Sequence, residues 1–147
     1  MRIVAPALLG LSAIGSLTCA GRRSEPGMPS PAARPSLAQV YFWRARPGKL
    51  DEYNRYIREV AEPIDQAAQR GGAFLSVFTY VSRDTTTPWT HMRVFLLRDS
   101  VQLAGLGPAL DSAGMRVEPD SARRRMRSEY AATLRDRVGS ATVEILR

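Results

Sequence analysis

The sequence predicts an α+β domain in which four antiparallel strands form one sheet and two helices cover one of its faces. Two observations lead to this prediction. Between residues 38 and 147, short β-branched and aromatic runs alternate with segments of helical periodicity in the order strand, helix, strand, strand, helix, strand. The 147 residues leave room for one domain, and 44% hydrophobic with 24% charged residues is ordinary globular composition.

The first strand and the first helix are predicted at residues 38–46 and 50–70. The run AQVYFWRAR is β-branched and aromatic, and a Pro-Gly pair follows it. In the helix, apolar residues recur at gaps of three and four, and Gly71 and Gly72 terminate it. Because Pro63 lies inside this helix and lacks an N–H, we expect a kink there.

The second half of the domain begins with a hairpin of strands at 73–82 and 89–97. Three glycines and a proline predict broken helix and loop over 100–118, which is either a mobile lid or an irregular connection. A helix over 119–139 and a strand over 140–147 complete the order, which is the ferredoxin-like βαββαβ arrangement. The buried stripe of that last helix is predicted from its four-residue spacing as Ala122, Met126, Tyr130, Leu134 and Val138.

The N-terminal residues are predicted to lie outside the domain. Residues 1–20 combine a positive start with a short apolar run and are typical of an export signal, and 21–37 form a Pro-rich tether. Cys19 lies near the expected cleavage point, so the signal is either of lipoprotein type, with Cys19 acylated, or is cut after Ala20. We expect an exported protein, either periplasmic or held at a membrane through a lipid on Cys19.

Strand alternation predicts which side chains face the helices. On 89–97 the apolar set Met92, Val94 and Leu96 is expected on the helix side. On 140–147 the corresponding set is Ala141, Val143 and Ile145. On 38–46 either Tyr41 and Trp43 or Phe42 and Arg44 could face the helices, and Phe42 and Arg44 are assigned to the open face because a charged Arg44 would be costly among the helices. The open face is then expected to hold many aromatic and several charged side chains, namely Phe42, Arg44, Phe74, Phe78, Tyr80, Trp89, His91, Arg93, Phe95 and Glu144. Such a face is predicted to be buried by self-association or to surround a ligand.

The chain resembles the dimeric α/β-barrel superfamily in four local features. These are the strand end Arg-Ala-Arg-Pro-Gly-Lys at 44–49, the helix start Leu-Asp-Glu-Tyr at 50–53, the proline at 63, and the Gly-Gly pair that leads into a strand at 71–78. Its members include antibiotic-biosynthesis-type monooxygenases, EthD-like ethyl tert-butyl ether-degradation proteins and NIPSNAP-like proteins. The resemblance implies a homodimer whose sheets pack face to face around pockets. Oxygenase-like and haem-degrading members use an Asn, a Trp and sometimes a His. Here the single asparagine, Asn54, belongs to a helix, so that role is unfilled.

Seven residues are candidates for a site. His91, Arg93 and Trp89 are the catalytic candidates, because His91 is the only side chain whose ordinary pKa lies near 7. The alternative for His91 is a hydrogen-bonded place in a dimer interface. The candidates for ligand binding are Arg44, Phe78, Tyr80 and Glu144. Arg44 and Arg93 either bind a carboxylate of a ligand or form a structural ion-pair cluster with Glu144.

Several function classes are excluded by missing patterns. One cysteine and one histidine do not supply the usual zinc ligands, and neither a nucleophile elbow nor a phosphate-binding glycine loop is present. The net charge of +7 does not predict nucleic-acid binding, because four arginines precede the domain. We therefore expect an exported dimeric barrel protein that binds a small apolar or aromatic ligand. The alternatives are a cofactor-independent monooxygenase or haem-handling enzyme, and a structural envelope dimer with a filled barrel.

Overall fold

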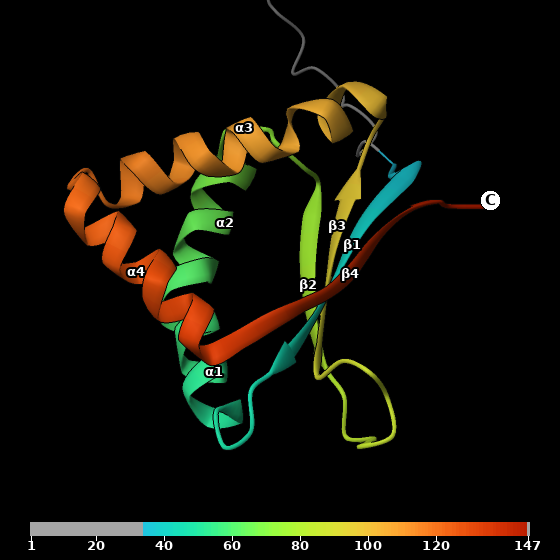
Figure 1. The fold of residues 1–147 in the computed structure, drawn as a ribbon. Coiled ribbons are helices and arrows are strands. Elements are labelled where there is room, and N and C mark those ends of the chain that lie inside the picture. The colour runs from blue at the N-terminus through green and yellow to red at the C-terminus, as the bar shows by residue number, and fades with distance from the viewer. Residues whose placement is uncertain (1–33, 147) are drawn as a thin grey trace, which may run out of the picture. The chain divides into compact units, whose positions relative to one another are not determined.

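The computed structural model describes residues 34–146, so the predicted signal, Cys19 and most of the tether lie outside the described residues. Four strands form one antiparallel sheet in the spatial order β2-β3-β1-β4. Their bounds are β1 Leu37–Ala45, β2 Ser76–Val81, β3 His91–Leu97 and β4 Arg135–Glu144. With helices between β1 and β2 and between β3 and β4, this is the predicted ferredoxin-like fold. Figure 1 shows the helices on one side of the sheet.

The connection from β1 to β2 is helical throughout and includes an irregular turn. It consists of α1 (Leu50–Tyr56), a π-helical turn (Ile57–Ala61) and α2 (Glu62–Arg70). The π turn lies immediately before Pro63, whose missing N–H cannot continue the regular ladder. The expected irregularity at this proline therefore takes the form of a π turn.

The connection from β3 to β4 differs from the prediction for residues 100–118. Instead of broken helix and loop, α3 runs unbroken over Ser100–Val117, and Pro108 lies within it. Asp99 caps its first turn by accepting a hydrogen bond from the Gln102 N–H at 2.9 Å. Because Leu106 and Ala113 are buried against the rest of the domain, their packing outweighs the poor helix propensity of glycine and proline.

Helix α4 (Ser121–Leu134) is shorter than predicted, and its buried stripe was misassigned. Met126 is 65% exposed and Tyr130 is 48% exposed, whereas Ala131 and Leu134 are buried. The chain becomes extended at Arg135, so Val138 belongs to β4 rather than to the helix. A register shift opposite Phe42 and Trp43 then reverses the alternation predicted for β4.

The face prediction for β3 was wrong. His91, Arg93, Phe95 and Leu97 are buried on the helix side, and Met92, Val94 and Leu96 lie on the open side. Alternation had placed the polar set outside because a buried His or Arg is costly without partners. The helices supply those partners, so the polar set can be buried.

The open face of the sheet is apolar. Cross-strand pairing places Val94 between Val40 and Phe78, and Met92 between Phe42 and Tyr80. Register likewise places Ala141 and Val143 on this face and Thr142 on the helix side, opposite to the prediction. Phe42, Phe78, Tyr80 and Arg44 occupy the open face as predicted. Phe74 does not, because it is 2% exposed and packs edge-on against Phe95 in the core.

Candidate binding site

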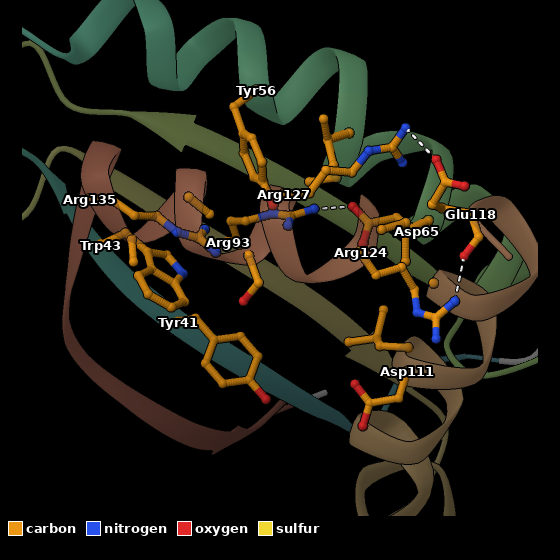
Figure 2. Close-up of a pocket in the computed structure, with 18 of the residues that line it drawn as sticks. Tyr41, Trp43, Tyr56, Asp65, Arg93, Asp111, Glu118, Arg124, Arg127 and Arg135 are labelled. Carbon is orange, nitrogen blue, oxygen red and sulfur yellow. Dashed lines mark hydrogen bonds and ion pairs between the residues drawn. The ribbon is translucent and has the colours of Figure 1, made fainter. Parts of the chain in front are cut away.

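A cavity of about 930 Å³ lies between the helix side of the sheet and the helices. The sheet contributes Tyr41, Trp43, Arg93 and Phe95, and the start of β4 contributes Arg135 and Arg137. Opposite them stand the π turn, α2, α3 and α4. Figure 2 shows Tyr41 and Trp43 beside each other on the sheet, with Arg93 directed toward Asp65 of α2.

A buried ion pair joins the sheet to α2 inside this cavity. Arg93 Nη2 donates to Asp65 Oδ2, and the two residues are only 8% and 4% exposed. Burial raises the pKa of Asp65 above its ordinary value, and the opposing effect of the Arg93 charge is smaller. The buried Arg93 Nε has no hydrogen-bond partner among the described residues. This nitrogen is shielded from solvent and from the cavity, so the ion pair leaves one buried donor without an acceptor within residues 34–146.

Stacked arginines and aromatic rings line the β4 side of the cavity. The Arg135 guanidinium lies 3.8 Å from the Trp43 ring centroid and 5.1 Å from that of Tyr53. Its Nη1 donates to the Tyr53 hydroxyl at 2.6 Å. Arg137 lies over the Tyr41 ring at 5.1 Å. Stacking of this kind holds a guanidinium by its face and leaves its N–H edges available.

The elbow between α3 and α4 is closed by two further arginines. Arg127 pairs with Glu118 at 3.0 Å, and Arg124 donates to the backbone carbonyls of Glu118 and Pro119 at 2.8 and 2.7 Å. Cations suit the carboxyl end of α3, where helix carbonyls lack internal partners. These two arginines are therefore committed to joining the helices.

His91 is fully buried beside the cavity and does not line it. Its Nε2 lies 3.0 Å from Asn54 Oδ1 and its Nδ1 lies 2.8 Å from Thr90 Oγ1. This network fits a neutral imidazole in which Nε2–H donates to Asn54 and Nδ1 accepts from the Thr90 hydroxyl. Burial, together with the Arg135 and Arg93 charges, lowers the pKa of His91 to about 4.

The remaining predicted site residues lie elsewhere. Of the seven candidates, only Arg93 lines the cavity. Trp89 packs against Phe42 at 5.9 Å, and Arg44, Phe78 and Tyr80 lie on the open face. Arg93 pairs with Asp65 rather than with Glu144, which lies exposed at the end of β4. The proposed Arg93–Glu144 cluster is therefore absent among residues 34–146.

Sequence reasoning missed most of the cavity. Tyr41 and Trp43 lie on the helix side, as the choice made for their strand implies, but they were not among the site candidates. Asp65 was not a candidate either, and Arg135 and Arg137 fell within the helix predicted over 119–139. A usable signal existed, since Arg135 and Arg137 alternate with aspartate in the two-residue period of a strand.

The walls of the cavity are of mixed chemical character. The cavity offers flat aromatic walls, apolar side chains from α2 and α3, and guanidinium donors. Within residues 34–146 there is no cluster of side chains suited to a metal ion. In the same range, no helix is long and apolar enough to cross a bilayer.

The fold and the cavity together define a ferredoxin-like α+β domain with a ligand-sized cavity under its helices. No protein-family model and no curated protein matches the chain. Solved structures with a similar fold include the following three. HapK from Hahella chejuensis is 12% identical over 75% of this chain and 92% of that chain, with a TM-score of 0.47, and PA3566 from Pseudomonas aeruginosa is 14% identical over 78% of this chain and 96% of that chain, with a TM-score of 0.46. A dimeric protein of unknown function and ferredoxin-like fold from Bacteroides fragilis is 11% identical over 74% of this chain and 93% of that chain, with a TM-score of 0.45. At this level of likeness they indicate neither ligand nor activity.

Proposed function

We propose that this chain is an exported, homodimeric binding protein for a small molecule with a flat apolar body, which it holds in the cavity between the sheet and the helices. One observation carries the proposal: a cavity of about 930 Å³ is walled by Tyr41, Trp43, Tyr56 and Phe95. That volume falls in the range of small-molecule sites, whose walls are typically apolar and aromatic with a few polar groups. The proposed ligand site therefore lies on the helix side of one sheet, whereas the sequence predicted a site between the sheets of two subunits.

Binding is favoured over the oxygenase and haem alternatives by the surroundings of His91. Both of its ring nitrogens are engaged, and its side chain is fully buried. A general base must reach the substrate proton, and an axial haem ligand needs a free nitrogen facing the cofactor. The residues present therefore do not fit haem held through His91.

The homodimer is supported by the open face of the sheet. Phe78, Tyr80 and Val143 are each between 45% and 50% exposed. Phe78 and Tyr80 lie beside the apolar row Met92, Val94 and Leu96, and Val143 lies on the same face across β1. A contiguous apolar sheet face of this kind is usually covered by a partner. A second copy offers a surface of the same shape and chemistry, which an isologous two-fold contact requires. Export, and a lipid on Cys19, rest on the N-terminal sequence pattern alone.

Filling the cavity tests the proposal. Ala132 lines it from α4, so Ala132→Trp is expected to occupy the space that a ligand needs. Ala122→Trp, an exposed position on the same helix that does not line the cavity, is the matched control. We expect 2-naphthamide to shift the amide NMR signals of Val60, Ile64 and Phe95 in the wild type and in the control. We expect no such shifts in Ala132→Trp.

Two results would count against a binding role for the cavity. One is binding that survives in Ala132→Trp with unchanged affinity. The other is a set of shifts confined to the open face around Val94. Both would place the apolar ligand outside the helix side of the sheet.

A further inference from the structure

We infer that the ligand carries a carboxylate, which binds at the β4 side of the cavity to Arg135 and Arg137. This inference rests on the proposed function, because it names the chemical class of molecule for the same cavity. The expected ligand is a flat or apolar acid rather than a neutral hydrocarbon. Three features of the cavity lead to it: its charge balance, the stacking of two of its arginines on aromatic rings, and the apolar wall that faces them.

The charge balance of the cavity is positive. Five arginines line it against three carboxylates, Asp65, Asp111 and Glu118. Asp65 is paired with Arg93, and Glu118 is paired with Arg127. Among the described residues, neither Arg135 nor Arg137 has a carboxylate within 4.0 Å of its guanidinium. Arg135 is half-buried and Arg137 is exposed, and two neighbouring cations without a counter-charge on one side of a cavity favour an anionic occupant.

The two unpaired arginines are held in place by aromatic rings. Trp43 and Tyr53 flank the guanidinium of Arg135, and Tyr41 lies under that of Arg137. Each spends one N–H on a neutral oxygen, the Tyr53 hydroxyl for Arg135 and the Ser140 hydroxyl for Arg137. The other in-plane donors remain for a ligand. A planar carboxylate matches such edges, because its two oxygens accept parallel hydrogen bonds from one guanidinium.

The rest of the cavity wall suits the remainder of such a molecule. Val60, Ile64, Leu110 and Met115 present apolar side chains from the π turn, α2 and α3. The cavity therefore combines a cationic side on β4 with an apolar side on the helices. A molecule with an acid group at one end and a flat apolar body fits both.

Matched probes test the charge of the ligand separately from its shape. We would titrate the full chain with three acids, 2-naphthoate, biphenyl-4-carboxylate and indole-3-acetate, and with the primary amide of each. In the wild type at least one acid is expected to bind roughly tenfold or more tightly than its amide, because charge-assisted hydrogen bonds are made only by the acid. The preference is expected to shrink as salt concentration rises.

Arginine substitutions locate the preference. Arg137→Gln is expected to bring acid and amide affinities within about twofold of each other, chiefly by weakening acid binding. Arg135→Gln is expected to have the same effect. If this variant unfolds because its side chain no longer stacks on Trp43 and Tyr53, the Arg137→Gln variant alone carries the test. The control is Arg125→Gln on α4, which removes the same charge from an exposed position outside the cavity and should keep the full preference.

The outcomes separate this inference from the proposed function. If acids and amides bind equally, and Ala132→Trp blocks both, the cavity is a binding site but the carboxylate assignment is overturned. If Arg125→Gln removes the preference as fully as Arg137→Gln, net charge rather than the site is responsible, and the assignment is again overturned. If no probe of either kind binds, the proposed function fails and this inference fails with it.

Discussion

At the scale of single residues, the helix side of the sheet shows how polar side chains are accommodated in the interior. His91 is satisfied by Asn54 from α1 and by Thr90, and Arg93 is satisfied in part by Asp65 from α2. Each partner belongs to a segment far away in sequence, except for Thr90. The polar residues of β3 therefore face inward because the first helix supplies their hydrogen-bond partners.

The buried histidine predicts a pH dependence of folding. The unfolded chain binds a proton on His91 with an ordinary pKa of 6.5, whereas the folded pKa is about 4. Between these values the unfolded state binds more protons, so stability is full above pH 6.5 and falls as the pH drops toward 4. The loss is about 3 kcal/mol, and His91→Gln should remove it.

Urea unfolding of wild type and His91→Gln across that pH window measures the effect. Since the chain has one histidine, the difference between the two pH profiles isolates it from other groups, including Asp65. Parallel profiles for the two proteins would contradict the assignment of a neutral buried imidazole.

The buried ion pair predicts a marked asymmetry between single and double variants. Asp65→Leu leaves the Arg93 charge buried without its partner, and we expect unfolding free energy to fall by about 3–5 kcal/mol. The double variant Asp65→Leu, Arg93→Met should recover most of that loss, because no unpaired charge remains. Chemical denaturation of the two variants checks this, and a double variant as unstable as the single one would show that the pair itself stabilises the fold.

At the scale of elements, how much could be predicted depended on whether the signal was local. The order of strands and helices, the end of the first helix and the side of the sheet taken by Tyr41 and Trp43 all followed from local pattern. The faces of β3 and β4 did not. The face of β3 depends on partners from another element, and that of β4 depends on where α4 ends and on a bulge.

The cavity was beyond sequence reasoning for the same reason. The candidate residues had been sought on the open face, which was expected to be rich in charge and aromatic rings. Of the seven site candidates, only Arg93 lines the cavity. Asp65 was missed because a carboxylate on an amphipathic helix is read as solvated, and only the register of α2 against β3 shows that it is buried.

Helix α3 contains glycines of low helix propensity, so replacing one of them by alanine is expected to change the stability of the domain. A Cβ added at Gly105 would meet nothing within 4 Å, and its φ is not positive. Gly105→Ala should therefore stabilise the domain by about 0.5–1 kcal/mol through higher helix propensity. Gly48→Ala is the opposite control, since Gly48 has a φ of 73° and should lose stability on substitution. Thermal or urea unfolding gives both values, and destabilisation by Gly105→Ala would argue that α3 is not a regular helix at that position.

At the scale of the whole molecule, the two faces of the sheet have different roles in this account. The helix side holds the cavity, and the open side presents the apolar row Met92, Val94 and Leu96, which we propose a second copy covers. This division explains why the ligand candidates Phe78 and Tyr80 lie away from the cavity. Their side chains suit a subunit interface, in which aromatic residues are common.

The dimer is tested by placing a charge on the open face. Phe78→Asp would bury an unpaired carboxylate between two subunits, so we expect it to yield a monomer by sedimentation or light scattering. Met126→Asp makes a comparable change on the outer surface of α4 and should leave the dimer intact. A Phe78→Asp protein that remains dimeric would show that the second copy binds elsewhere.

The central claim is that each chain holds a small molecule under its helices, and native mass spectrometry of the full chain recovered from an expressing cell tests it most directly. We predict a dimer that carries two equal added masses at saturation, one for each subunit, and that loses them in Ala132→Trp but not in Ala122→Trp. A dimer whose added mass is unaffected by Ala132→Trp, or that binds one molecule between its two subunits, would contradict the claim.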